Sequence, residues 1–144
     1  MNFQFGHTVI RMSFESVLDQ LKNELSKEGF VISGVTDFQK LHLPTGSSTG
    51  QYNVLTVYHT LLHNEMLTIG PAEGMILPCL ISVAETRPGE TMLALFNVTE
   101  TVCASSQNSL LQAVATEVTR RMEVAIHALE KKDAGDPDLV TSWG

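Results

Sequence analysis

Residues 75–98 have the sequence MILPCLISVAETRPGETMLALFNV, two apolar runs joined by a short polar segment. Pro88 and Gly89 occur in the order typical of a type II turn, whose third residue adopts a positive φ. Pro78 has no N–H to donate, so we expect it at a strand start, a sheet edge or a bulge. The stretch therefore predicts a β-hairpin with strands at 75–86 and 91–98.

Both strands of this hairpin carry apolar residues on both faces. Because side chains alternate along a strand, one face of the first strand holds Leu77, Cys79, Ile81 and Val83, and the other holds Leu80, Ser82 and Ala84. The second strand sets Leu93 and Leu95 against Met92, Ala94, Phe96 and Val98. A sheet with helices on one side and apolar residues on both needs a second cover, which a partner subunit or a ligand would supply.

The sequence before the hairpin predicts three more strands and a helix. Ser13 is a helix N-cap residue and Gly29 a C-terminal stop, so a helix is expected at 14–28. The β-rich segments are 5–12, 30–35 and 52–59. Shorter helices are expected at 37–43 and 60–69, with a loop at 45–51.

A long helix is predicted after the hairpin, from Ser105 or Ser106 to about Lys132. Its apolar stripe consists of Leu111, Val114, Ala115, Val118, Met122, Ala125, Ile126 and Leu129. Residues 133–144 contain Gly, Pro and three Asp, which indicates a flexible acidic tail. We therefore expect a single α+β domain at 1–132: a largely antiparallel sheet backed by helices on one face.

Charge and composition exclude several classes of function. The chain has 144 residues, with 9 basic and 16 acidic side chains and a net charge of −7. This balance argues against binding nucleic acid or an anionic membrane surface. There is no apolar stretch of membrane-spanning length and no visible secretory signal, so a cytoplasmic protein with two free thiols, Cys79 and Cys103, is expected.

Three features resemble a bacterial family of unknown function, number 302. They are the helix segment SFESVLDQLKNELSKEGF, the strand YNVLTVYH, and the later stretch GMILPCLISVAE with its Leu-Pro-Cys. The resemblance covers residues 5–102. It departs after the third strand, where the family has Asn-Pro and this chain has His59-Thr60-Leu61.

This resemblance implies a β-α-β-β-β-β-α order, with a curved sheet backed by two helices as in TATA-binding-protein-like folds. It also implies a homodimer. The family brings no established activity, so the resemblance leaves the cofactor unknown.

Cys79, His59 and His63 are the candidates for chemistry. A reactive thiol needs a nearby cation or a helix N-terminus, and the sequence neighbours of Cys79 supply none. His59 and His63 have the i, i+4 spacing of a metal or haem pair, with Glu65, His7, His42 or Cys79 as a third ligand. The alternative interpretations are a buried cysteine, a polar strand end and an exposed helix position.

Two functions of different classes follow. The first is a non-catalytic homodimer that binds a small apolar or amphipathic ligand on its sheet, through Tyr58, His59, Leu80 and Phe96. The second is a thiol- or metal-dependent enzyme that uses Cys79 with His59 and His63. We favour the first, because the sequence contains no catalytic constellation.

Overall fold

The fold is taken from a computed structural model that describes residues 5–38, 50–60, 64–65, 68, 79–97 and 109–134. Within these residues the elements are β1 (Phe5–Ile10), α1 (Phe14–Lys27), β2 (Phe30–Asp37), β3 (Tyr52–His59), β4 (Cys79–Arg87), β5 (Glu90–Asn97) and α5 (Ser109–Ala134). This is the β-α-β-β-β-β-α order that the family resemblance implied.

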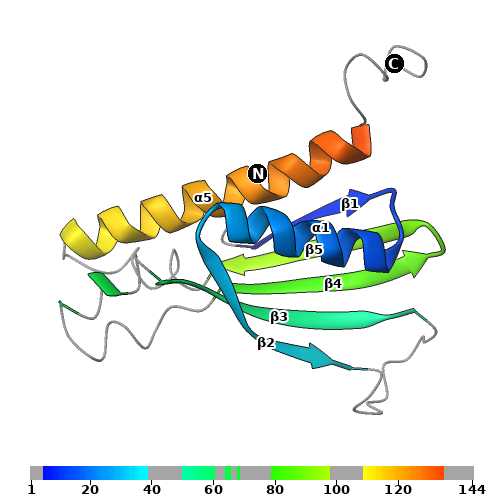
Figure 1. The fold of residues 1–144 in the computed structure, drawn as a ribbon, viewed down its shortest axis with the longest axis horizontal. Coiled ribbons are helices and arrows are strands. Elements are labelled where there is room, and N and C mark those ends of the chain that lie inside the picture. Colours follow the sequence, from blue (N-terminus) through cyan, green and yellow to red (C-terminus); the bar gives the residue numbers. More distant parts are fainter. Residues whose placement is uncertain are drawn as a thin grey trace.

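The strands form one sheet in the order β1-β5-β4-β3-β2, and every neighbouring pair is antiparallel. Both helices lie on the same side of this sheet, with the long α5 running above α1 (Figure 1). The predicted α+β class and the antiparallel sheet with helices on one face are confirmed. No helix in the described part of the chain is both long and apolar enough to cross a membrane.

Local sequence signals set the ends of α1 and the β4–β5 turn. The Ser13 hydroxyl accepts a hydrogen bond from the Ser16 N–H, which satisfies a donor of the first helical turn. Gly29 adopts φ +88° just after α1, and Gly89 adopts φ +80° in the hairpin turn. Glycine reaches these left-handed conformations without a Cβ clash, as the sequence predicted.

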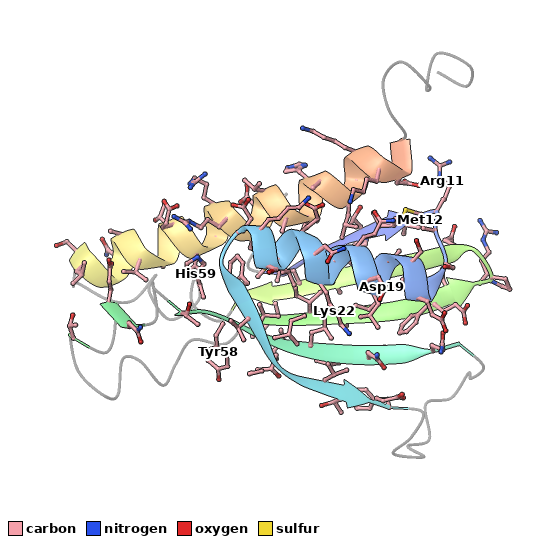
Figure 2. The ribbon with its side chains drawn as sticks, viewed as in Figure 1. Arg11, Met12, Asp19, Lys22, Tyr58 and His59 are labelled. Atoms are coloured by element: carbon pink, nitrogen blue, oxygen red, sulfur yellow. The ribbon has the colours of Figure 1, made fainter. Side chains whose placement is uncertain are left out.

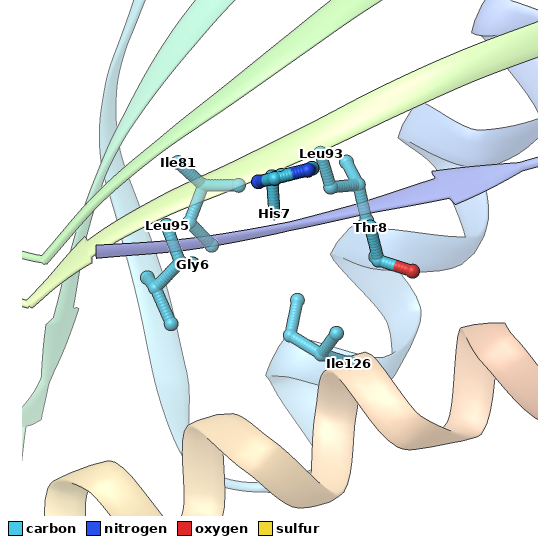
Figure 3. Close-up of a pocket in the computed structure, with 7 residues that line it drawn as sticks. All are labelled: Gly6, His7, Thr8, Ile81, Leu93, Leu95 and Ile126. Atoms are coloured by element: carbon cyan, nitrogen blue, oxygen red, sulfur yellow. The ribbon is translucent and has the colours of Figure 1, made fainter. Parts of the chain in front are cut away.

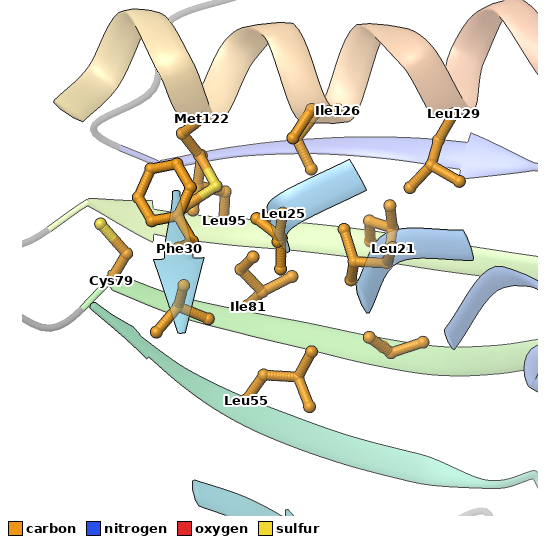
Figure 4. Packing of buried hydrophobic residues seen from close by; sticks show 14 of the residues in the cluster. Leu21, Leu25, Phe30, Leu55, Cys79, Ile81, Leu95, Met122, Ile126 and Leu129 are labelled. Atoms are coloured by element: carbon orange, nitrogen blue, oxygen red, sulfur yellow. The ribbon is translucent and has the colours of Figure 1, made fainter. Parts of the chain in front are cut away.

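The hydrophobic core lies between the helices and one face of the sheet (Figure 4). α5 contributes Val114, Ala115, Val118, Met122, Ala125, Ile126 and Leu129, all buried as predicted. The sheet contributes alternate residues, including Leu55, Val57, Cys79, Ile81, Val83, Leu93 and Leu95. Burial of these apolar side chains is the main favourable contribution to folding.

Several predicted boundaries are wrong by two residues. β1 ends at Ile10 instead of residue 12, and β2 continues from the predicted end at Val35 to Asp37. α5 continues to Ala134, beyond the predicted start of the acidic tail. Asp133 belongs to the folded unit because its Oδ1 accepts a hydrogen bond from the Arg11 backbone N–H at 2.9 Å.

Other predictions lie wholly or partly outside the described residues. These are Pro78, Cys103, the start of the last helix at 105–108, the tail from residue 135, and most of 37–51 and 60–69.

A helix-free sheet face as the candidate binding site

The side of the sheet opposite α1 and α5 carries no helix in the ranges that the structure describes (Figure 1). Paired residues of antiparallel strands share a face, so the strand registers assign its members. The middle row is His7, Ala94, Ser82, Val54 and Thr36, one residue from each strand. One flanking row consists of Phe96, Leu80, Thr56 and Gly34. The other consists of Val9, Met92, Ala84 and Tyr52. Tyr58, near the C-terminal end of β3, pairs with Val31, near the N-terminal end of β2. We call this surface the helix-free face.

The helix-free face is unusually apolar for a sheet surface. Val9, Tyr52 and Phe96 are 44%, 39% and 37% exposed. Tyr52 also packs edge to face against Phe38, with ring centroids 5.2 Å apart. An antiparallel sheet that has one solvated face ordinarily alternates apolar and polar residues. Because this one is apolar on both faces, the helix-free face has the character of an interaction site.

The three rows of the helix-free face are uncharged, and Glu90, two residues before Met92 on β5, lies on the same side at the hairpin end, where it pairs with Arg87. None of these rows contains Lys, Arg, Asp or Glu. The charged residues of the described strands, Asp37, Glu85, Arg87 and Glu90, lie near strand ends. On a chain with a net charge of −7, this surface suits an uncharged apolar group and not a phosphate backbone.

Three of the four predicted ligand-binding residues lie on the helix-free face. Leu80 and Phe96 are directly paired across β4 and β5, and Tyr58 is on β3. His59 is the exception, because the residue next to Tyr58 in a strand points to the opposite face. Figure 2 shows the two side chains of β3 directed to opposite sides, with His59 toward α5. The structure therefore separates His59 from the other three.

His59 is buried beneath the turn that joins α1 to β2, at 1% exposure. Its Nε2 lies 2.8 Å from the Glu28 carbonyl oxygen and 3.2 Å from Arg121 Nη1. Nε2 donates to the carbonyl in the tautomer that carries a hydrogen there, and accepts from Arg121 in the other. Arg121 of α5 also donates to this carbonyl, from Nη1 at 3.4 Å, and the Phe30 ring packs edge-on against the imidazole. His59 thus contacts the end of α1, β2 and α5, and its Nε2 faces the Glu28 carbonyl and Arg121.

Glu117 of α5 binds Arg121 of this joint and also Arg120. Hydrogen bonds from Arg120 and then from Arg121 lower the pKa of Glu117 to about 2. Arg121 Nε donates to Glu117 Oε1 at 2.9 Å. A carboxylate with this pKa holds no proton near neutral pH, so Glu117 is not suited to general acid catalysis.

Cys79 lies on the helix-covered face and is fully buried in the core (Figure 4). Apolar surroundings disfavour a thiolate, the form that acts as nucleophile and metal ligand. Among the described residues, no group of three or more His, Cys, Asp and Glu side chains is placed to hold a metal ion. His63, the other half of the predicted metal pair, lies outside the described residues.

A small cavity lies on the covered side, between α5 and the strands β1, β4 and β5. It has a volume of about 10 Å³ and is lined by Ile81, Leu93, Leu95, Ile126 and residues 6–8 of β1 (Figure 3). This is about the space that one water molecule needs. The cavity is therefore too small for an organic ligand, and the helix-free face is the better candidate site.

Residues 5–129 match the model of one protein family, whose description is "Domain of unknown function DUF302". The chain belongs to the DUF302 family. It is similar to a solved structure described as "Crystal structure of uncharacterized conserved protein DUF302 from Bacillus stearothermophilus", with a TM-score of 0.70 and 17% identity. The alignment covers 86% of this chain and 96% of that chain. No curated protein matches the chain.

Membership of the DUF302 family supports the fold and brings no activity, so a function must be argued from this chain's own surface. Sequence reasoning did not select Val9, Tyr52, Val54 and Met92 as site residues, although they lie on the same face as Leu80 and Phe96. They could have been identified by applying the alternation of side chains to all the strands of the sheet, instead of to β4 and β5 alone.

Proposed function

We propose that this DUF302 domain is a non-catalytic homodimer that binds a small apolar or amphipathic ligand on its helix-free face. The observation that supports the proposal is the composition of this five-strand surface. Leu80 and Phe96 are paired on its inner strands β4 and β5, and its rows contain no Lys, Arg, Asp or Glu. Covering apolar surface is favourable by roughly 25 cal/mol per Å². A ligand or a partner would supply that cover.

A few polar groups among the apolar ones suit an amphipathic ligand. His7 and Ser82 belong to the middle row, and Tyr58 lies toward the end of β3. Ligand sites are commonly apolar surfaces with a small number of hydrogen-bonding groups that orient the ligand. An imidazole, a hydroxyl and a phenol each both donate and accept hydrogen bonds. The polar end of the ligand would therefore lie near one of these three.

The proposal is tested with Nile red, a neutral apolar dye, and with native mass spectrometry of the purified protein. Replacing Leu80 or Phe96 with Gln removes apolar contact area, and we expect dye affinity to fall roughly tenfold, about 1.4 kcal/mol. Val124 on the outer side of α5 is 42% exposed and gives the matched control, Val124→Gln. Equal dye binding by all variants, together with no co-purified molecule, would contradict ligand binding on this face.

A further inference from the structure

We infer that a second copy of this chain covers the helix-free face, so that two sheets pack face to face with the helices outermost. The inference rests on the proposed function and deepens it by naming the surface that forms the homodimer. Three properties of the face support it: its lack of charge, its area and its distribution of side-chain sizes.

Charge restricts how two copies approach one another. Each chain has a net charge of −7, and the described parts of α1 and α5 carry most of the described ionisable groups, on the opposite side of the sheet. Like charges placed against one another across an interface are unfavourable, and buried ionic groups lose their hydration. Contact through the helix-free face brings none of these groups into the interface.

The area of the face is sufficient for a specific interface. Five strands at about 4.8 Å spacing, each contributing about six residues at about 3.3 Å, give a plane of roughly 480 Å² per copy. Two such planes give roughly 960 Å² before side-chain relief is counted, just below the lower limit of about 1,000 Å² for biological interfaces. A whole-face contact therefore reaches this limit once side-chain relief is included, whereas a contact through one strand does not.

The sizes of the side chains favour two interlocking sheets. The middle row has the small Ala94 and Ser82 on the central strands, and the flanking rows have Leu80 with Phe96 and Met92 with Tyr52. Packed sheets lie about 10 Å apart with side chains of their inner faces interdigitating. Large side chains of one copy over small ones of the other satisfy that geometry.

A second copy also explains how a sheet surface would hold a small ligand. Ligand sites enclose most of the ligand, commonly 70–90% of its surface. An open sheet contacts a ligand on one side only. Two facing sheets would contact it on both sides. This arrangement needs part of the row of small side chains, beside His7 and Ser82, to stay uncovered by the large side chains of the other copy.

The test is the mass of the full chain in solution, by light scattering over a range of concentrations. We expect a dimer, and we expect Ala94→Arg to raise its dissociation constant at least about a hundredfold, because each copy then brings an unpaired guanidinium group into an apolar interface. Val124→Arg places the same group on exposed α5 and should leave the dimer unchanged.

Spin-label distances keep the inference testable if Ala94→Arg does not fold. Labels on Ser82→Cys, with Cys79 and Cys103 replaced by Ala, should lie less than about 25 Å apart, because packed sheets are separated by about 10 Å. Labels on Val124→Cys should lie more than about 30 Å apart, since a sheet and a helix layer of each copy intervene.

A monomeric wild type, a dimer that Ala94→Arg leaves intact, or Ser82 labels farther apart than Val124 labels would each overturn the face-to-face arrangement. A monomer that still binds Nile red through Leu80 would overturn this arrangement and leave ligand binding supported. A face-to-face dimer that binds no dye and carries no small molecule would support the arrangement and contradict ligand binding.

Discussion

The two faces of the sheet are built from the same strands, yet they differ in what covers them. On β4, Ile81 points to the helices and is fully buried, whereas its neighbour Leu80 points to the helix-free face and stays half-buried. The covered face is closed by α1 and α5 and contains large aliphatic residues. The helix-free face is apolar without a cover from the described residues.

This difference distinguishes apolar residues buried in the core of one copy from apolar residues that only another molecule would cover. A sheet face that only met water would gain solubility from charged residues. The rows of the helix-free face contain none of them. The apolar residues of that face therefore point to a role outside the folding of a single copy.

The largest expected effect comes from truncating neighbouring residues on the two faces. Ile81→Ala should lower the free energy of unfolding by about 2–5 kcal/mol, because it leaves a cavity in the core. Leu80→Ala should cost less than about 1 kcal/mol in a monomer, because its side chain is only partly buried. Chemical denaturation of both variants, at protein concentrations below the dimer dissociation constant, measures the two losses of stability. Equal losses would show that the helix-free face is covered within one copy.

Much of the fold was predictable because local rules act on adjacent residues. Pro88-Gly89 set the turn, and Ser13 and Gly29 set the two ends of α1, as expected. The end of α5 was not predictable in this way. It depends on Asp133 reaching Arg11 of a segment 122 residues away, and no periodic pattern encodes that contact.

Two glycines provide the next comparison, one on each side of the sheet. A Cβ at Gly29 would lie 2.5 Å from His59 Nε2, and the residue also has a positive φ. Gly29→Ala should therefore cost about 2–3 kcal/mol and disturb the joint of α1, β2 and α5. Gly34→Ala, on the helix-free side of β2, meets no atom within 4 Å and should change stability by less than about 0.5 kcal/mol. Thermal unfolding of both variants checks the difference, and a neutral Gly29→Ala would contradict it.

The candidate site was predictable only in part, because sequence patterns report on residues that are close together in the chain. Tyr58, Leu80 and Phe96 follow from alternation along single strands. His59 was grouped with them because it adjoins Tyr58 and ends a strand. Its contacts are with Glu28, just after α1, and with Arg121 of α5, and both residues are far from β3 in the sequence. Such a contact between distant elements leaves no signal in the spacing of one segment.

Cys79 tests whether the covered face is inert. Its burial predicts slow alkylation of the native protein at pH 7, with Cys103 replaced to remove its signal. Cys79→Ala should cost on the order of 1 kcal/mol, and Cys79→Ser at least as much because it buries a hydroxyl. An engineered thiol at exposed Val124 should react much faster than Cys79. Fast labelling of Cys79 would instead favour the thiol-dependent enzyme.

The smallest expected effect comes from the polar link between the two helices that cover the sheet. Glu24 of α1 is buried at 7% exposure, and its Oε2 accepts from Lys132 Nζ of α5 at 3.0 Å and from Lys27 Nζ at 3.2 Å. The hydrogen bond from Lys132 is the main cause of a lowered pKa of the Glu24 carboxyl, which burial opposes and Lys27 supports. The folded state therefore binds this proton less readily than the unfolded state.

Because the pKa of Glu24 is lower in the folded state, its contribution to stability is complete above the unfolded value of about 4.3 and is lost as pH falls through the folded value. Glu24→Gln should lower the free energy of unfolding by about 1 kcal/mol or less at pH 7, and the difference from wild type should disappear toward pH 3. Lys132→Gln should resemble it, whereas Lys27→Gln should have a smaller effect, because Lys27 belongs to the same helix as Glu24 and does not connect α1 to α5. Urea unfolding at several pH values measures these differences. If Lys27→Gln destabilised the protein more than Lys132→Gln, the Glu24–Lys132 bond between the two helices would not be the contact that stabilises the packing of α5.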